Sequence, residues 1–250
     1  MLIVNADDYG SDVAATNAIA RCFEAGSITS TTLMVHMPDS ERAAEMAQRS
    51  GWPIGLHLNF TQPFEAAGLP ASVRDRQLEM CEYLSDLSLR RRVPEHRPHV
   101  RRMVRNAISE QIEAYVELFG RLPTHLDSHQ HSHTALGVLA ELPRHIALRR
   151  TASRRGDQIA ARFLSTDVFM SFPAIEAAAR AAERQTVELM VHPSRPEELE
   201  VMLAQPWLDS MRSAELGDFR DLEPRRDRVS SMLSALPLEP AAAVISELSV

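Results

Sequence analysis

The sequence of 250 residues predicts an α/β protein, a single domain folded as a distorted (β/α) TIM-like barrel. Short apolar segments that resemble strands alternate with helical segments along the chain, a pattern typical of a mainly parallel sheet. Four of the strand-like segments end in aspartate, asparagine or histidine. In a barrel of this kind the C-terminal ends of the strands converge on one mouth, so we expect one active site there. The length fits a single large domain, residues 1–250.

The first half of the chain predicts three strands. Residues 2–6 form a short buried strand that runs into Asp7-Asp8-Tyr9-Gly10, where the glycine indicates a turn. Periodicity and proline or glycine boundaries place the other elements: strands over 31–36 and 53–60, and helices over 12–25, 38–48 and 98–119. Residues 62–95 lose clean periodicity and are expected to form a long excursion between elements.

The second half continues the alternation of strand and helix. We expect strands near 146–151, 163–169, 186–193 and 241–248, and helices over 173–183, 197–203 and 206–216. Residues 135–148 are expected to form a helix or a pair of helical turns. A flat doubly wound sheet would gather strand ends at one edge as well. The absence of a glycine-rich phosphate loop after the first strand weakens a nucleotide-binding version of that fold.

The most informative stretch is Thr124–His133, in which four histidines and one aspartate stand at alternating positions. If it begins as a strand, His125, Asp127 and His129 point the same way and Leu126 packs on the other side. Burying three ionisable groups is unfavourable unless they are hydrogen-bonded or bound to a metal, and imidazole with carboxylate is a usual transition-metal set. The alternative is a solvated loop or a surface histidine cluster.

The other strand ends carry complementary groups. A turn can bring Asp7 and Asp8 to the same cavity, where a cation would keep one ionised and leave the other free as a general base. His57 and Asn59 share one face of their strand, and His192 ends a later one. Alternatively, the aspartates only form an Asx-type turn and His57 is a hydrogen-bonded core residue. One carboxylate and two imidazoles would hold a divalent metal and leave positions open for hydrolysis.

Composition and net charge argue against some classes of binding partner. A net charge of −7 argues against a nucleic acid or an anionic membrane bound through a basic patch. No apolar run approaches the ~18 residues of a membrane-spanning helix. Cys22 and Cys81 lie far apart and the N-terminus lacks the pattern of a signal peptide, so we expect a cytoplasmic protein without a disulfide framework. A homodimer is the base-rate expectation.

Four motifs, in this order, resemble those of the YdjC-like carbohydrate deacetylases: Val4–Gly10, Gly55–Thr61, Pro123–His133 and Val191–Pro193. The resemblance extends from residue 1 to about 193. Members of that family act on chitooligosaccharides, and others are associated with hopanoid lipid biosynthesis. The resemblance therefore implies a metal-dependent hydrolase that removes the N-acetyl group of an amino sugar or a glycolipid head group and releases acetate.

Position by position, the resemblance also implies roles for the polar residues. Asp8, His57 and His129 would hold one divalent ion, with magnesium or zinc as the leading candidates. Asp7 would be the base that activates water, and His192 the acid that protonates the leaving amine or stabilises the oxyanion. The remaining candidates would orient these groups or contact substrate: Asn59, His125, Asp127, His131, His133 and Arg195. Arg195 lies in Ser194-Arg195-Pro196, where the family usually has a glycine after His-Pro, and it could add a cation to the pocket wall.

Two other functions compete with this interpretation. His131-Ser132-His133 is an HxH pair, which occurs in metal-dependent phosphoesterases and amidohydrolases, although those barrels typically place it on the first strand. The chain could also be a non-catalytic metal- and sugar-binding protein of the same fold. A protein that only binds has no need of a free base, so the presence of Asp7 beside three ligand candidates argues against this.

Overall fold

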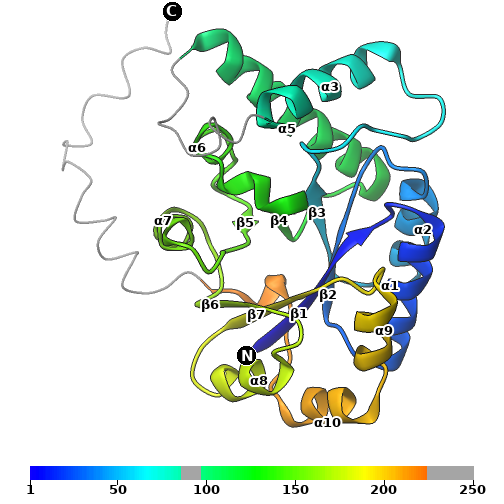
Figure 1. The fold of residues 1–250 in the computed structure, drawn as a ribbon, viewed down its shortest axis with the longest axis vertical. Coiled ribbons are helices and arrows are strands. Elements are labelled where there is room, and N and C mark those ends of the chain that lie inside the picture. Colours follow the sequence, from blue (N-terminus) through cyan, green and yellow to red (C-terminus); the bar gives the residue numbers. More distant parts are fainter. Residues whose placement is uncertain (86–96, 224–250) are drawn as a thin grey trace, which may run out of the picture.

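The computed structural model describes residues 1–85 and 97–223 and confirms the α/β fold (Figure 1). All strand pairs are parallel, and the sheet has the order β5-β4-β3-β2-β1-β7-β6. The strands are β1 (Leu2–Tyr9), β2 (Ser30–Leu33), β3 (Ile54–Leu58), β4 (His125–Ser128), β5 (Ala147–Leu148), β6 (Val168–Ser171) and β7 (Val187–Val191). Within the described ranges no pairing joins β5 to β6, so the curled sheet is a distorted, open barrel.

Helices surround the outside of the curled sheet (Figure 1). They are α1 (Val13–Ala25), α2 (Ser40–Ser50), α3 (Ala71–Ser85), α5 (Pro98–Phe119), α6 (Leu136–Leu139), α7 (Arg154–Arg162), α8 (Ile175–Ala182), α9 (Pro196–Met202) and α10 (Gln205–Ser213). Two 3-10 helices, η1 (His129–Thr134) and η2 (Phe219–Asp221), complete the described elements. Of the helices in residues 1–85 and 97–223, none is long and apolar enough to cross a membrane.

The inner face of the sheet changes from apolar to ionisable along the barrel axis. Near the start of the strands, Ile3 and Ala147 pack with Phe219 of η2, whose ring stacks on His125 with a centroid separation of 3.5 Å. Further along β1 the side chains of Asn5 and Asp7 follow in the same alternation. We call Ile3, Ala147, Phe219 and the stacked His125 the apolar plug, which lies at the N-terminal end of the strands. The carboxylates and the other histidines of the site lie at the C-terminal end.

Three predicted elements differ in the structure. β1 continues through Tyr9, where a turn was expected, because the strand is distorted at Asp8 and then pairs again with β2. The predicted excursion at 62–95 contains α3, whose only buried residues are Gln77, Met80 and Leu84. That apolar face is too narrow to give clear helical periodicity. Where a helix or a pair of helical turns was expected over 135–148, the structure has the short helix α6, followed by β5.

The helix α7 was not predicted, and β6 begins at Val168, five residues later than expected. The other boundaries agree within a few residues, and α5 has the predicted bounds. α2 begins at Ser40, two residues after Pro38. The strand expected at 241–248 and residues 86–96 of the expected excursion lie outside the described residues.

Candidate active site

A cavity of about 300 Å³ lies at the C-terminal ends of β1, β3, β4 and β7. Four separate strand ends therefore contribute to one cavity, which is the arrangement that the motifs indicated. Its lining residues are Asp7, Asp8, His57, Ser128, His129, Gln130, His131, Met190, His192 and Arg195.

The two adjacent aspartates reach this cavity because the strand is irregular between them. Successive side chains of a regular strand point to opposite faces. Asp8, however, has a φ of +70°, and the pairing of β1 with β2 shifts register between Ala6 and Tyr9. A left-handed conformation costs a non-glycine residue about 1 kcal/mol or more, and such residues are enriched at functional sites. Here it brings both carboxylates to one side.

Asp8 faces His57 directly. Its Oδ1 lies 3.2 Å from Nε2 of His57, yet this buried oxygen has no hydrogen-bond partner among the residues that the structure describes. Burial alone would raise the pKa of Asp8, but His57, His192 and His129 together lower it to about 2. Asp8 is thus an ionised carboxylate with an uncommitted oxygen aimed into the cavity.

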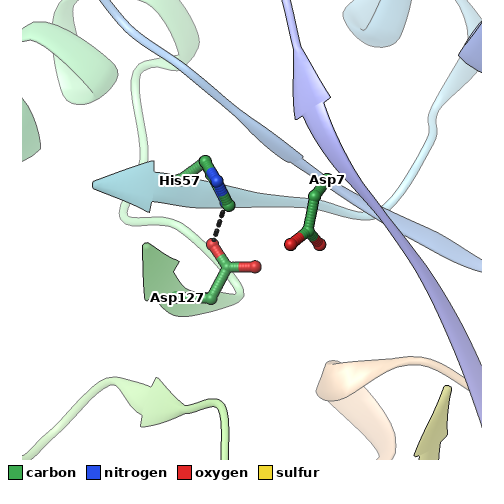
Figure 2. A group of neighbouring side chains, drawn as sticks. All are labelled: Asp7, His57 and Asp127. Atoms are coloured by element: carbon green, nitrogen blue, oxygen red, sulfur yellow. Dashed lines mark hydrogen bonds and ion pairs between the residues drawn. The ribbon is translucent and has the colours of Figure 1, made fainter. Parts of the chain in front are cut away.

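His57 is held by a carboxylate on its other nitrogen (Figure 2). Its Nδ1 lies 2.7 Å from Oδ1 of Asp127, and the hydroxyl of Thr32 donates to the other oxygen of Asp127. This contact keeps a proton on Nδ1 and directs Nε2 toward Asp8. Burial opposes charge on the ring, but Asp127 and Asp8 hold the pKa of His57 well above its usual range.

His129 lies just beyond β4, at the start of η1. Its Nδ1 is 2.6 Å from the hydroxyl of Thr61, which leaves Nε2 as its available ligand atom. The rings of His57 and His129 meet edge to face with centroids 6.1 Å apart. Burial lowers the pKa of His129, so the ring is neutral at pH 7 and able to bind a metal.

Two overlapping sets of side chains could hold a metal ion. Asp7, His57 and Asp127 bring one potential ligand atom each within 4.8 Å of one another. In that set, however, both carboxylates already bind the guanidinium of Arg149, which contributes a positive charge at the same place. A second cation between these carboxylates would meet that charge at short range.

The set Asp8, His57 and His129 has no such competitor. Two donor atoms that share an ion at about 2.1 Å each, at roughly 100° from one another, lie about 3.2 Å apart. The measured separation of Asp8 Oδ1 and His57 Nε2 is 3.2 Å. The separation of Asp8 Oδ1 and His57 Nε2 is therefore that of two ligands on one divalent ion. In the described residues His129 does not bring its nitrogen within 4.8 Å of both, so it would have to approach on binding. Asp127 and Thr61 fix the orientation of the two rings.

Arg149 is the central residue that the sequence did not reveal. It lies one position after β5, is fully buried, and donates to both oxygens of Asp7 at 2.6 Å each. It also contacts Asp127 at 2.8 Å and donates to Glu188 at 2.6 Å. Burial opposes the charge of Arg149, but the three carboxylates hold its pKa well above the usual range. Several arginines stand close together in this segment, and Arg149 looks like the others in the sequence. Its position directly after the short strand β5 is the one signal that distinguishes it.

The other candidate residues occupy different positions. His131 lines the cavity, with its ring edge-on to Phe169 at 5.5 Å. His133 is buried beside Ser128, whose hydroxyl lies 2.7 Å from its Nδ1. His125 belongs to the apolar plug, where burial lowers its pKa to about 3.

Asn59 and Arg195 serve the surrounding structure in different ways. The side chain of Asn59 accepts from the backbone N–H groups of Thr61 and Gln62, and so orders the turn that carries the hydroxyl partner of His129. Arg195 lines the cavity wall and forms an ion pair with Glu198 at 3.0 Å.

A second cavity of about 290 Å³ adjoins the first, since both are lined by Asp8 and His129. Its buried floor includes Met34 and Met37, and its rim includes Glu65. Asp8 and His129, two of the candidate metal ligands, therefore lie between the two cavities.

Comparisons with known proteins agree with this description. The model of a family described as "YdjC-like protein" matches residues 1–227. A carbohydrate deacetylase from Danio rerio is 38% identical over 71 residues, which are 28% of this chain and 21% of that protein. A chitooligosaccharide deacetylase from Serratia marcescens is 34% identical over 76 residues, 30% of either chain. The aligned segments thus cover under a third of these relatives' length.

A solved structure from Enterococcus faecalis, of a protein whose name proposes cellobiose-phosphate cleavage, has a similar fold. It superposes with a TM-score of 0.66 at 22% identity, and the match covers 87% of this chain and 97% of that one. At that identity the likeness concerns the fold alone.

Proposed function

The chain belongs to the YdjC-like protein family, and from this membership we propose that it is a metal-dependent hydrolase that removes the N-acetyl group of an amino sugar. One observation carries the proposal. The uncommitted oxygen of Asp8 faces Nε2 of His57 at 3.2 Å, while a second carboxylate, Asp7, is held beside them on Arg149. Metal-dependent hydrolysis of an amide needs ligands for the metal, which would activate the carbonyl group, and a separate base that deprotonates the attacking water. Asp8 and Asp7 are suited to these two roles.

Each side chain has a role in this reaction. A divalent ion held by Asp8, His57 and His129 would polarise the acetyl carbonyl and lower the pKa of water. Asp7 takes a proton from the attacking water, whose oxygen forms the new bond to the carbonyl carbon. His192 gives a proton to the sugar nitrogen as the C–N bond breaks, so that acetate and a free amine leave. The separation of 3.9 Å between Nε2 of His192 and Oδ2 of Asp7, both at the cavity, supports these two roles.

The substrate that we propose is an N-acetylated sugar unit attached to a further group, either another sugar or the apolar part of a glycolipid. Its support is the pair of adjoining cavities, which offers room on both sides of Asp8 and His129. The names of the relatives, carbohydrate deacetylase and chitooligosaccharide deacetylase, point to the same substrate class. Cytoplasmic location and a homodimer stay predictions; two free cysteines, Cys22 and Cys81, are consistent with the former.

The phosphoesterase and amidohydrolase alternative has less support. It required His131 and His133 to act as an HxH pair. The ring of His133 is fully buried and bonded to Ser128, and only His131 of the two lines the cavity.

The test is acetate release from N-acetylated mono-, oligo- and lipid-linked amino sugars. The purified protein is stripped of metal and then reloaded with one divalent ion at a time. We expect release to return with at least one ion and to be lost in Asp7→Asn, which keeps the ligand set. Full activity of Asp7→Asn on each sugar that the wild type cleaves would contradict the assignment of the base. Phosphate ester cleavage without acetate release would favour the alternative.

A further inference from the structure

Glu198 makes a buried contact with His192 that the roles proposed so far do not use. It lies in the first turn of α9, and only 4% of its surface is exposed. Its Oε2 accepts the backbone N–H of His192 at 2.7 Å. Its Oε1 lies 3.7 Å from Nδ1 of the same histidine and accepts from Arg195 at 3.0 Å.

The local fold makes this contact specific. His192 follows β7 directly, and the chain turns back so that the N–H of Arg195 bonds the carbonyl of His192 and that of Glu198 bonds the carbonyl of Arg195. Pro196 then starts the helix in its first turn. The carboxylate of Glu198 is thereby placed against both the backbone and the ring of His192.

The two nitrogens of His192 face two different carboxylates. Nδ1 faces Glu198, while Nε2 faces Asp7 and the cavity. Burial would raise the pKa of Glu198, but its bonds to His192 and Arg195 hold it below its usual range, so the group is an anion. An anion beside Nδ1 favours a proton on that nitrogen and stabilises the ring when both nitrogens carry protons.

We propose that Glu198 is a positioning residue that holds a proton on Nδ1 of His192, in the neutral and in the doubly protonated ring, and so directs Nε2, the nitrogen that would donate to the substrate, into the cavity. This inference rests on the proposed function only for its effect on catalysis; the effect on the ring stands without it. Arg195 shares Oε1 of Glu198 and so moderates the negative charge that the ring experiences. Arg195 thus acts on His192 through Glu198.

A purely structural role for Glu198 makes a different prediction, and Glu198→Gln separates the two. The glutamine carbonyl can still accept the backbone N–H of His192, so the turn is kept while the charge is lost. Glu197→Gln is the matched control, because it removes the same charge from the same helical turn at an exposed position.

The first measurement is independent of activity. The ¹⁵N shifts of the imidazole nitrogens are recorded for the zinc-loaded full-length protein at neutral pH, and His192 is assigned from the signals lost in His192→Gln. We expect the tautomer protonated on Nδ1 in the wild type and in Glu197→Gln. In Glu198→Gln the signals should move toward a mixture of tautomers. Unchanged His192 signals in Glu198→Gln would overturn the proposal.

The second measurement is kinetic. We expect Glu198→Gln to lower kcat by about 10- to 100-fold, the usual effect of removing a group that orients a functional histidine, with KM changed less than about twofold.

The outcomes distinguish this inference from the proposed function. A lower kcat with unchanged ring signals, or moved signals with an unchanged kcat, would overturn the positioning role. If the wild type releases no acetate from any sugar, the proposed function fails. In that case the tautomer comparison alone supports or overturns the contact between Glu198 and His192.

Discussion

Asp7 binds Arg149 through both carboxylate oxygens, at 2.6 Å each; Arg149 is fully buried, and Asp7 is buried except where it lines the cavity. The guanidinium fixes the plane of the carboxylate, which leaves the remaining lone pairs of Asp7 in a defined direction. The same guanidinium also reaches Asp127, the partner of His57. One buried cation therefore orients the proposed base and, through Asp127, a proposed metal ligand.

Arg149→Met should destabilise the protein strongly. It leaves three buried carboxylates without their shared cation, and removing one partner of a buried ion pair typically costs about 3–5 kcal/mol. The free energy of unfolding from urea titration measures the effect. Arg154→Met, at an exposed position, is the control and should stay within about 0.5 kcal/mol of wild type. An Arg149→Met protein as stable as this control would show that the network contributes nothing to the fold.

Glu188 should make stability depend on pH. One guanidinium cannot balance three carboxylates, and burial raises the pKa of Glu188 to about 7 despite Arg149. The folded protein thus retains a proton that the unfolded chain loses near pH 4.5. The free energy of unfolding should fall by about 3 kcal/mol as pH rises from 4.5 to 7, at about 1.4 kcal/mol for each unit of pKa difference.

Glu188→Gln isolates this contribution, since the amide oxygen can still accept from Arg149. Urea titrations at pH 5 and pH 8 should show the variant gaining stability relative to wild type at the higher pH. A constant difference between the two proteins across this range would contradict the raised pKa.

The fold and the location of the site could be predicted from local sequence patterns. Parallel strands that end in Asp7-Asp8, His57, Asp127 and His192 must bring those ends together, because the sheet geometry leaves no other arrangement. What local patterns could not supply are the contacts that depend on tertiary burial. Glu197 and Glu198 are adjacent and chemically alike, yet one is exposed and the other touches His192. The left-handed Asp8 is likewise set by the register shift between β1 and β2.

Binding of the metal should release a proton. The pKa of His57 lies well above its usual range because Asp127 and Asp8 favour the charged ring, so a proton occupies Nε2 at neutral pH. The ion must displace that proton, and its apparent affinity should rise with pH until the pKa of His57 is passed. Calorimetric titration with zinc in two buffers of different ionisation enthalpy measures the protons released. Equal enthalpies in both buffers would mean that His57 is not a ligand.

The two possible ligand sets predict opposite effects of neighbouring substitutions. If Asp8, His57 and His129 hold the ion, Asp8→Asn should weaken zinc binding by a factor of 100 or more, because it removes the charged ligand. Asp7→Asn should change the affinity less than about fivefold, since its carboxylate binds Arg149. Asp127→Asn should fall between them, at about 10- to 100-fold, through the lost orientation of His57. If instead Asp7, His57 and Asp127 were the ligands, Asp7→Asn would abolish binding and Asp8→Asn would spare it. Direct zinc titration of the three variants, each checked for folding by circular dichroism, therefore decides which of two adjacent carboxylates binds the metal and which is free to act as the base.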